Sequence, residues 1–155
     1  MFHIILYEPE IPPNTGNIIR LSVNTGFKLH LIEPLGFSTD EKSLKRAGMD
    51  YMKRTNFHVW ENLDECFENI NCKAVYAVST KGNTNYTKIK YETEDAFIFG
   101  PESRGLPLKI REKFTSIFIP MKSEGRSLNL ANAVSIITYE AWRQNAFIGK
   151  SILSE

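Results

Sequence analysis

The chain has 155 residues, of which 42% are hydrophobic and 24% charged, a balance typical of a folded globular domain and unlike a disordered tail. Its formal net charge is only +1, from 19 basic and 18 acidic residues, so no global field would draw it onto nucleic acid or an anionic membrane. Any binding to RNA must therefore come from a local surface or from surfaces pooled in an oligomer.

The predicted elements alternate between strand and helix from the first residues onward. An apolar, β-prone run over Phe2–Tyr7 predicts a strand, and apolar residues at helical spacing over Gly16–Val23 predict a helix after a proline-bearing turn. Gly26 is expected to end that helix, and Lys28–Ile32 predicts a second strand. The chain thus begins as strand, loop, helix and strand.

The same alternation continues to the C-terminus. Further helices are predicted near 41–47, 63–70, 108–113 and 129–145, and further extended segments at 57–60, 74–79, 95–99 and 116–119. Strands that alternate with helices indicate an α/β fold with a mostly parallel sheet covered by helices on both faces. No internal repeat or linker-like stretch divides the sequence, so residues 1–155 are predicted to form a single domain with no appended RNA-binding domain.

The N-terminal segment and the cysteines predict a cytoplasmic location. The opening MFHIILYEPEIPP lacks the basic region of a signal peptide, and no apolar run is long enough for a membrane span. Cys66 and Cys72 form no CxxC pair and have no histidines at metal-ligand spacing, so they are expected to be reduced packing residues. We therefore expect a cytoplasmic protein that uses neither a membrane nor a metal.

Four loops that follow predicted strands are the candidate binding elements, because ligands of open α/β sheets lie beyond the carboxyl ends of the strands. They span residues 8–17, 79–82, 99–107 and 119–129. The motifs GxGxxG and GxxxxGK[ST] are missing after the first strand and elsewhere, as are GxSxG and HExxH. Loops rich in Gly, Pro, Asn and Ser suit a ligand such as adenine that is held largely by main-chain groups.

Three long motifs in these loops carry a family resemblance. NTGNIIR at 14–20, FGPESRGLP at 99–107 and IPMKSEGRSLNLANAVSIITYEAW at 119–142 resemble the three ordered motifs of the SpoU class of SPOUT RNA 2′-O-methyltransferases. The opening LYEPEIPPNTGNIIRL narrows the likeness to the YibK or TrmL group, which methylates the wobble nucleotide of tRNA, cytidine or modified uridine. The likeness covers nearly the whole chain.

The resemblance implies a fold and a cofactor. It implies a C-terminal deep trefoil knot, an exception to the rule that chains do not thread loops. It also implies that S-adenosylmethionine, or its product S-adenosylhomocysteine, lies bent in the knot and is held mainly by main-chain groups. Motif matching assigns the cofactor contacts to Val78, Gly100, Glu102, Ile119, Met121, Ser127 and Leu128.

The implied reaction moves a methyl group to a ribose 2′-hydroxyl, which is a poor nucleophile and must be oriented and deprotonated. The family assigns this work to the position of Arg20. Because a guanidinium hardly deprotonates in proteins, two roles stay open for Arg20: it assists proton removal, or it clamps the adjacent phosphate and orients the ribose. Ser127 and Asn129 are expected to hold the nucleotide or the cofactor carboxylate, and Tyr139 is expected to reach the same site.

Several of these residues have simpler interpretations. Asn14 and Asn17, assigned to the RNA substrate, are also favoured helix N-caps. Glu102 is equally suited to pairing with Arg104 or to capping backbone amides, and Ser127 and Asn129 are both suited to capping the last helix. A basic cluster that includes Lys42 and Arg46 is suited to RNA phosphates or to plain solvation.

The last predicted helix carries an apolar stripe at helical spacing, formed by Leu130, Val134, Ile137, Thr138, Ala141 and Trp142. Packing in the core of one chain explains this stripe. The resemblance also implies a homodimer, which would bury a wider stripe and would combine two basic surfaces for RNA. The expected function is therefore tRNA wobble 2′-O-methylation, with the anticodon loop as target because its bases are exposed. Two alternatives stay open, a related enzyme with another RNA target and a module that binds nucleotide or RNA without catalysis.

Overall fold

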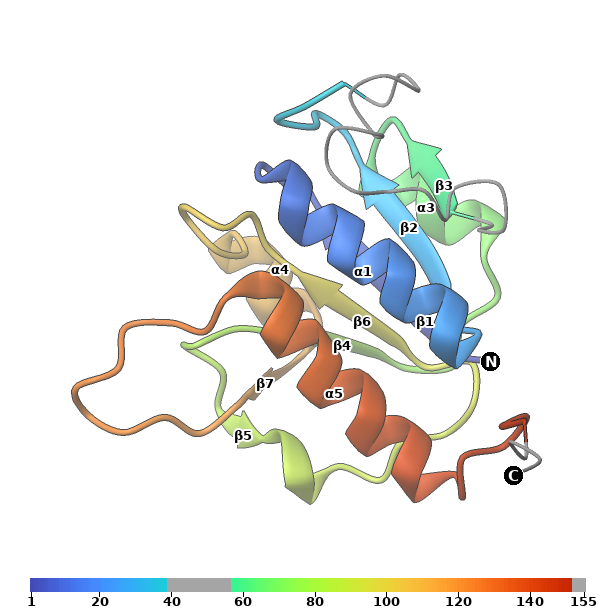
Figure 1. The fold of residues 1–155 in the computed structure, drawn as a ribbon. Helices are drawn as coiled ribbons and strands as arrows, with labels where there is room; N and C mark the ends of the chain where they lie inside the picture. Colours follow the sequence, from blue (N-terminus) through green and yellow to red (C-terminus); the bar gives the residue numbers. More distant parts are fainter. Residues whose placement is uncertain (39–56, 152–155) are drawn as a thin grey trace.

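The computed structural model of the chain describes residues 1–38 and 57–151, and these form an α/β fold (Figure 1). The predicted helix at 41–47 and the basic residues Lys42 and Arg46 lie outside the described residues. The α/β class with a mostly parallel sheet is confirmed. The trefoil knot stays a prediction.

The described residues build a seven-stranded sheet in the order β3-β2-β1-β6-β4-β7-β5, and its strand pairs are parallel. The strands are β1 (His3–Tyr7), β2 (Lys28–Ile32), β3 (Phe57–Trp60), β4 (Val75–Val78), β5 (Thr84–Asn85), β6 (Ala96–Phe99) and β7 (Thr115–Phe118). The helices are α1 (Pro12–Thr25), α3 (Leu63–Asn69), α4 (Leu108–Lys113) and α5 (Leu130–Gln144), with a 3₁₀ turn η2 at Tyr86–Lys88.

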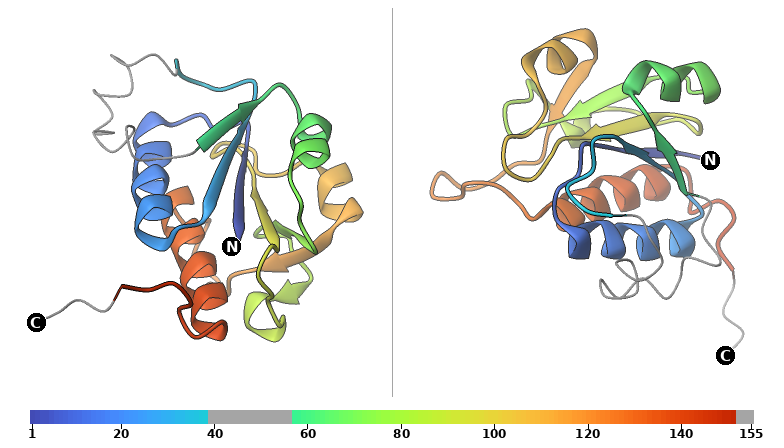
Figure 2. Two further views of the ribbon diagram at one scale, coloured as in Figure 1. Left: turned by 90° about the vertical axis from the view of Figure 1, so that its right-hand side faces the viewer. Right: turned by 90° about the horizontal axis from the view of Figure 1, so that it is seen from above.

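The helices cover both faces of the sheet, as a parallel sheet requires. Figure 2 shows α1 and α5 on one face and α3 and α4 on the other. Alternate residues of β1 separate the two cores, because side chains of a strand point to opposite faces. Ile4 and Leu6 pack with residues of α1 and α5, whereas Ile5 packs with Cys66 of α3 and Ile110 of α4.

Helix α1 begins earlier than the predicted Gly16. Its N-cap is Ile11, and the prolines Pro12 and Pro13 stand in its first turn, where a missing N–H costs no hydrogen bond. It ends at Gly26 as predicted, with that residue in the left-handed conformation and its N–H bonded to the carbonyl of Ser22 at 2.8 Å. Starting at Pro12 places Asn14 inside the helix instead of at its cap.

Helix α5 confirms the predicted stripe and, of the two predicted caps Ser127 and Asn129, only Asn129. All six stripe residues are buried, and α5 packs beside α1 over the sheet. The side chain of Asn129 accepts hydrogen bonds from the backbone N–H groups of Ala131 and Asn132, so it caps the helix. The first residues of α5 are thereby fixed at the end of the loop 119–129.

A series of hydrogen bonds that runs through Trp60, His30 and His3 joins the first three strands. Trp60 donates from Nε1 to His30 Nδ1 at 3.1 Å, so the proton of His30 lies on Nε2 and is donated to His3 Nδ1 at 3.0 Å. His3 then donates from Nε2 to Glu94 at 3.1 Å. Both imidazoles are buried and neutral in this arrangement, and a further proton on either ring would set two donors against each other.

This series of hydrogen bonds predicts that the protein loses stability in mild acid. Burial and the neighbouring His3, His58 and Lys28 lower the pKa of His30 to about 3, while the unfolded residue titrates near about 6.5. The unfolded state therefore binds more protons in this window, and the free energy of unfolding falls as the pH falls. We expect His30 alone to lower it by about 2 kcal/mol between pH 7 and pH 5, measured by urea unfolding.

The matched variants are His30→Gln, which should flatten this pH dependence, and His58→Gln on the neighbouring strand, which should keep most of it. A wild-type unfolding free energy that is equal at the two pH values would contradict the assignment of two neutral, buried imidazoles.

No helix within the described residues is long and apolar enough to cross a membrane.

Candidate functional site

A cavity of about 570 Å³ opens at the carboxyl ends of β4, β6 and β7. It lies where the loops 79–82, 99–107 and 119–129 come together with the start of α1. Its lining residues are Ile11, Asn14, Val78, Ser79, Thr80, Phe99, Gly100, Pro101, Glu102, Ser103, Arg104, Gly105, Leu106, Ile119, Met121, Ser127, Leu128, Asn129, Leu130 and Ala133. Its size is in the range of cavities that bind a nucleoside-sized molecule.

The cavity brings together all seven residues predicted to contact the cofactor, from Val78 to Leu128. Asn14 and Asn129, separated by most of the sequence, also line it. Segments assigned to one site by motif matching therefore meet in space. Sequence reasoning did not select Ile11, Ser79, Thr80, Ser103 and Arg104 as site residues, although each lies in one of the four loops singled out as binding elements.

Glu102 holds the loop 99–107 against the start of α1. Its carboxylate accepts hydrogen bonds from the backbone N–H of Glu10 at 2.8 Å, the N–H of Ile11 at 3.1 Å and the side-chain amide of Asn14 at 3.2 Å. These donors lie at the N-terminal end of α1, where a negative charge is favoured. The expectation that Glu102 caps backbone amides is confirmed, and the same residue lines the cavity.

Asn14 carries this network on to α5. It is only 6% exposed, and its Oδ1 accepts a hydrogen bond from Asn129 Nδ2 at 2.9 Å. The N-cap interpretation of Asn14 is wrong, because Ile11 is the cap and Asn14 uses its side chain between two other segments. A single series of hydrogen bonds thus joins one residue from each of the three motifs: Asn14, Glu102 and Asn129.

Replacing Glu102 by Gln should loosen this corner of the cavity. An amide has one oxygen and two N–H groups, so it cannot accept from three donors and would turn a donor toward at least one of them. We expect the free energy of unfolding to fall by about 1–3 kcal/mol, measured by urea denaturation. The control is Glu112→Gln, at an exposed position of α4, which should change it by less than about 0.5 kcal/mol. Equal stability of both variants would contradict the bridging role.

Arg104 pairs with two carboxylates of the loop that follows β1. Its guanidinium forms ion pairs with Glu8 and, at 3.4 Å, with Glu10. Glu10 also accepts from the hydroxyl of Ser103 at 2.7 Å and from its backbone N–H at 2.9 Å, and these bonds lower the pKa of the Glu10 carboxyl. The expected pairing of Arg104 with Glu102 is thus replaced by pairing with Glu8 and Glu10.

Gly100 allows the main chain to fold closely at the cavity wall. A Cβ atom there would lie 2.3 Å from the backbone nitrogen of Leu106 and 2.4 Å from the backbone carbon of Gly105. Gly82, in the neighbouring loop, is under a similar restriction, with Ile117 backbone atoms at 2.5 Å. At Gly100 the cavity wall is therefore closely packed main chain, which suits a ligand recognised by backbone groups.

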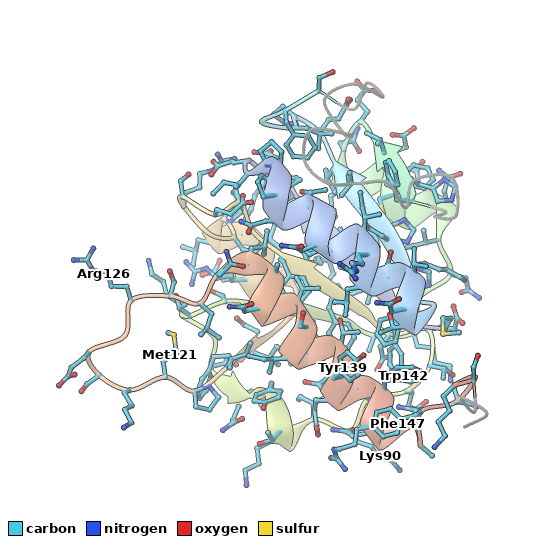
Figure 3. All side chains as sticks on the ribbon, in the orientation of Figure 1. Lys90, Met121, Arg126, Tyr139, Trp142 and Phe147 are labelled. Carbon is cyan, nitrogen blue, oxygen red and sulfur yellow. The ribbon has the colours of Figure 1, made fainter. Side chains whose placement is uncertain are left out.

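The structure does not bring every predicted site residue into the cavity. Arg20 and Asn17 are exposed on α1, and Tyr139 is 46% exposed on α5. Tyr139 packs edge-on against Trp142, with ring centroids 5.8 Å apart. Figure 3 shows Tyr139 beside Trp142 along α5, while Met121 and Arg126 lie on the projecting loop between β7 and α5. The roles assigned to Arg20, Asn17 and Tyr139 stay predictions.

The acidic, histidine and cysteine side chains of residues 1–38 and 57–151 do not form any group of three that could hold a metal ion. Both cysteines are free thiols, and burial raises the pKa of Cys66 to about 12. A thiol with such a pKa is a packing residue and a poor nucleophile.

Residues 1–139 match the SpoU rRNA Methylase family. A tRNA (cytidine(34)-2'-O)-methyltransferase from Methylovorus glucosotrophus (strain SIP3-4) is 51% identical over 152 residues, which cover 96% of this chain and 99% of that protein.

Two solved structures share the fold. One gives structural insights into the 2-OH methylation of cytidine or uridine 34 on tRNA; it is 41% identical, with a TM-score of 0.89, over 94% of this chain and 97% of that one. The other is the SpoU methyltransferase AviRb from Streptomyces viridochromogenes in complex with AdoMet. It is 23% identical, with a TM-score of 0.81, over 93% of this chain and 57% of that one.

Proposed function

Because this chain belongs to the SpoU rRNA methylase family, we propose that it transfers a methyl group from S-adenosylmethionine to the ribose 2′-hydroxyl of the tRNA wobble nucleotide. The observation that carries this proposal is the cavity in which the three family motifs meet. Support for tRNA as the substrate comes from the relative that is 51% identical over nearly the full length of both chains.

The residues of the cavity fit the cofactor. S-adenosylmethionine, when bound, supplies a methyl group on a positively charged sulfur. Gly100, where closely packed main chain leaves no room for a Cβ atom, lines the cavity together with the apolar side chains of Val78, Ile119 and Leu128. We assign the cofactor to these residues together with Glu102, Met121 and Ser127.

The side chains around the cavity divide into positioning and reacting groups. Asn129 uses its oxygen to cap α5 and its amide to bond Asn14, so it acts by holding the cavity wall. Ser127, on the loop before α5, takes no part in these hydrogen bonds of Asn129. We assign it to holding the substrate or the cofactor carboxylate. Arg20 either assists removal of the proton from the 2′-hydroxyl or clamps the adjacent phosphate and orients the ribose, and in the second role its charge stays in place because a guanidinium hardly deprotonates.

The proposed function also includes the partners of the chain and its location in the cell. We place Asn17 on the RNA side of the site with Asn14, and we propose that two copies of the chain form a homodimer that acts on the anticodon loop in the cytoplasm. Pooling two surfaces in this way would compensate for a net charge of only +1 per chain.

The test is methyl transfer from labelled S-adenosylmethionine to two synthetic anticodon stem-loops. One carries cytidine at position 34 and the other 2′-deoxycytidine at the same position, so the two differ by one oxygen atom. We expect label in the first and none in the second. Equal labelling of both would exclude the wobble ribose as acceptor, and labelling of neither alongside labelled ribosomal RNA would assign the enzyme to another RNA.

A further inference from the structure

Arg104 occupies a position at the cavity that the assignments above do not use. It lies in the loop after β6, lines the cavity with Ser103 and Leu106, and leaves 53% of its side chain exposed. A guanidinium carries five N–H donors, and its two ion pairs engage one donor on each terminal nitrogen. Donors therefore remain for a molecule bound at the cavity.

The two carboxylates fix the direction of this guanidinium. Glu8 and Glu10 approach Arg104 from the loop that follows β1, and Ser103 in turn holds Glu10 with two hydrogen bonds. A long, flexible side chain that would otherwise sample many rotamers is thus restrained before any ligand binds. Such restraint lowers the entropy that binding would cost.

The backbone that carries these carboxylates is strained and firmly held. Glu8 has φ of 49°, in the left-handed region that a non-glycine residue adopts only at a cost. Its N–H is bonded to the carbonyl of Ile32 at 3.0 Å, and the N–H of Gly36 is bonded to the carbonyl of Pro9 at 2.9 Å. Strain that the surrounding structure maintains is concentrated at functional sites in proteins.

The charge at this position favours a neutral ligand over a phosphate. One guanidinium faces two carboxylates, and the Glu10 carboxyl has a lowered pKa and is ionised at neutral pH. A phosphate brought to Arg104 would meet this surplus of negative charge, whereas the carbonyl oxygen or ring nitrogen of a nucleobase accepts the same hydrogen bonds without that repulsion.

We propose that Arg104, oriented by Glu8 and Glu10, donates hydrogen bonds to the base of the target nucleotide. This inference rests on the proposed function, since it concerns the nucleotide whose ribose is methylated. It makes Arg104 a residue that binds the base, distinct from the residues assigned to the ribose and the cofactor.

The test is a cycle of binding measurements in the presence of S-adenosylhomocysteine. Wild type and Arg104→Gln are each titrated with an anticodon stem-loop that carries either cytidine or an abasic ribose at position 34. Loss of the base should weaken wild-type binding by about ten- to a hundredfold, and loss of the guanidinium should weaken binding of the cytidine RNA similarly. Removing both should cost little more than removing either one, because the same contact is lost.

The dependence of binding on salt separates a base contact from a phosphate contact. A base contact leaves the slope of log Kd against log salt unchanged in Arg104→Gln, whereas loss of a phosphate contact would reduce its magnitude by about 0.7. Arg104→Lys keeps the charge but not the planar fork, so it should lose the coupling to the base as well. The control is Arg143→Gln, which removes an exposed arginine that is paired with Glu140 on α5.

Additive effects together with a reduced salt slope would overturn the proposal in favour of a phosphate contact. Additive effects with an unchanged slope would overturn it in favour of a purely structural ion pair. A wild-type chain that fails to methylate the cytidine stem-loop would instead count against the proposed function, whereas a wild type that methylates it and shows no coupling counts against the base contact alone.

Discussion

Gly100→Ala should weaken cofactor binding at least a hundredfold. The added Cβ would lie 2.3 Å from the backbone nitrogen of Leu106, far inside the distance at which real Cβ atoms meet other atoms, and the obstacle is main chain that cannot rotate away. The loop 99–107 must shift to accept it, and that loop carries Glu102 and Arg104 along the cavity wall. We expect cofactor affinity to fall at least a hundredfold and the free energy of unfolding by about 1–3 kcal/mol.

Titration calorimetry with S-adenosylhomocysteine measures the first effect and urea unfolding the second. Gly125→Ala is the matched control, because its Cβ would come only to 3.2 Å from the carbonyl oxygen of Lys122 in the exposed loop 119–129. It should leave unfolding nearly unchanged. Wild-type affinity in Gly100→Ala would show that the wall at this residue is not part of the cofactor site.

Arg20→Ala should stop methyl transfer while leaving cofactor binding intact. Arg20 is exposed on α1, outside the set of residues that line the cavity, so its loss should not alter the cofactor site. Orientation of the ribose and help with its proton contribute about 10²- to 10⁴-fold to such a step, and we expect a loss of that size in kcat. Single-turnover transfer to tRNA and calorimetry with the cofactor product measure the two properties separately.

The variant Arg20→Lys distinguishes the two roles left open for this residue. A lysine keeps the positive charge near a phosphate but replaces the planar fork, so a clamp should be partly retained and a guanidinium-specific role lost. Transfer by Arg20→Ala at the wild-type rate would remove Arg20 from the mechanism altogether.

The elements that the sequence predicts best are those with a clear period or a strong end signal. The strand at Lys28–Ile32 and the helix at Leu108–Lys113 have the predicted bounds, and Gly26 ends α1 as expected. The early start of α1 was missed because two prolines favour a turn as much as a first helical turn. The short strand Thr84–Asn85 has too few residues for any alternation to be visible, and its pairing with β7 depends on tertiary structure.

The candidate site was predictable as a set of loops but not as a set of contacts. The motifs place Gly100, Glu102 and Asn129 in loops that follow strands, and a parallel sheet gathers such loops at one edge. The bonds from Glu102 to the amides of Glu10 and Ile11 join residues about ninety positions apart, which no local pattern reports. The same holds for the strained conformation of Glu8 and its pairing with Arg104.

The measurement that tests the central claim most directly is the position of the methyl group in the product. Unmodified bulk tRNA is incubated with the wild-type chain and S-adenosylmethionine, digested with a nuclease, and the methylated fragment is sequenced by mass spectrometry. We predict one added methyl group, on the ribose of the wobble nucleotide. A methyl group on a base, or on the ribose of any other tRNA nucleotide, would contradict this account.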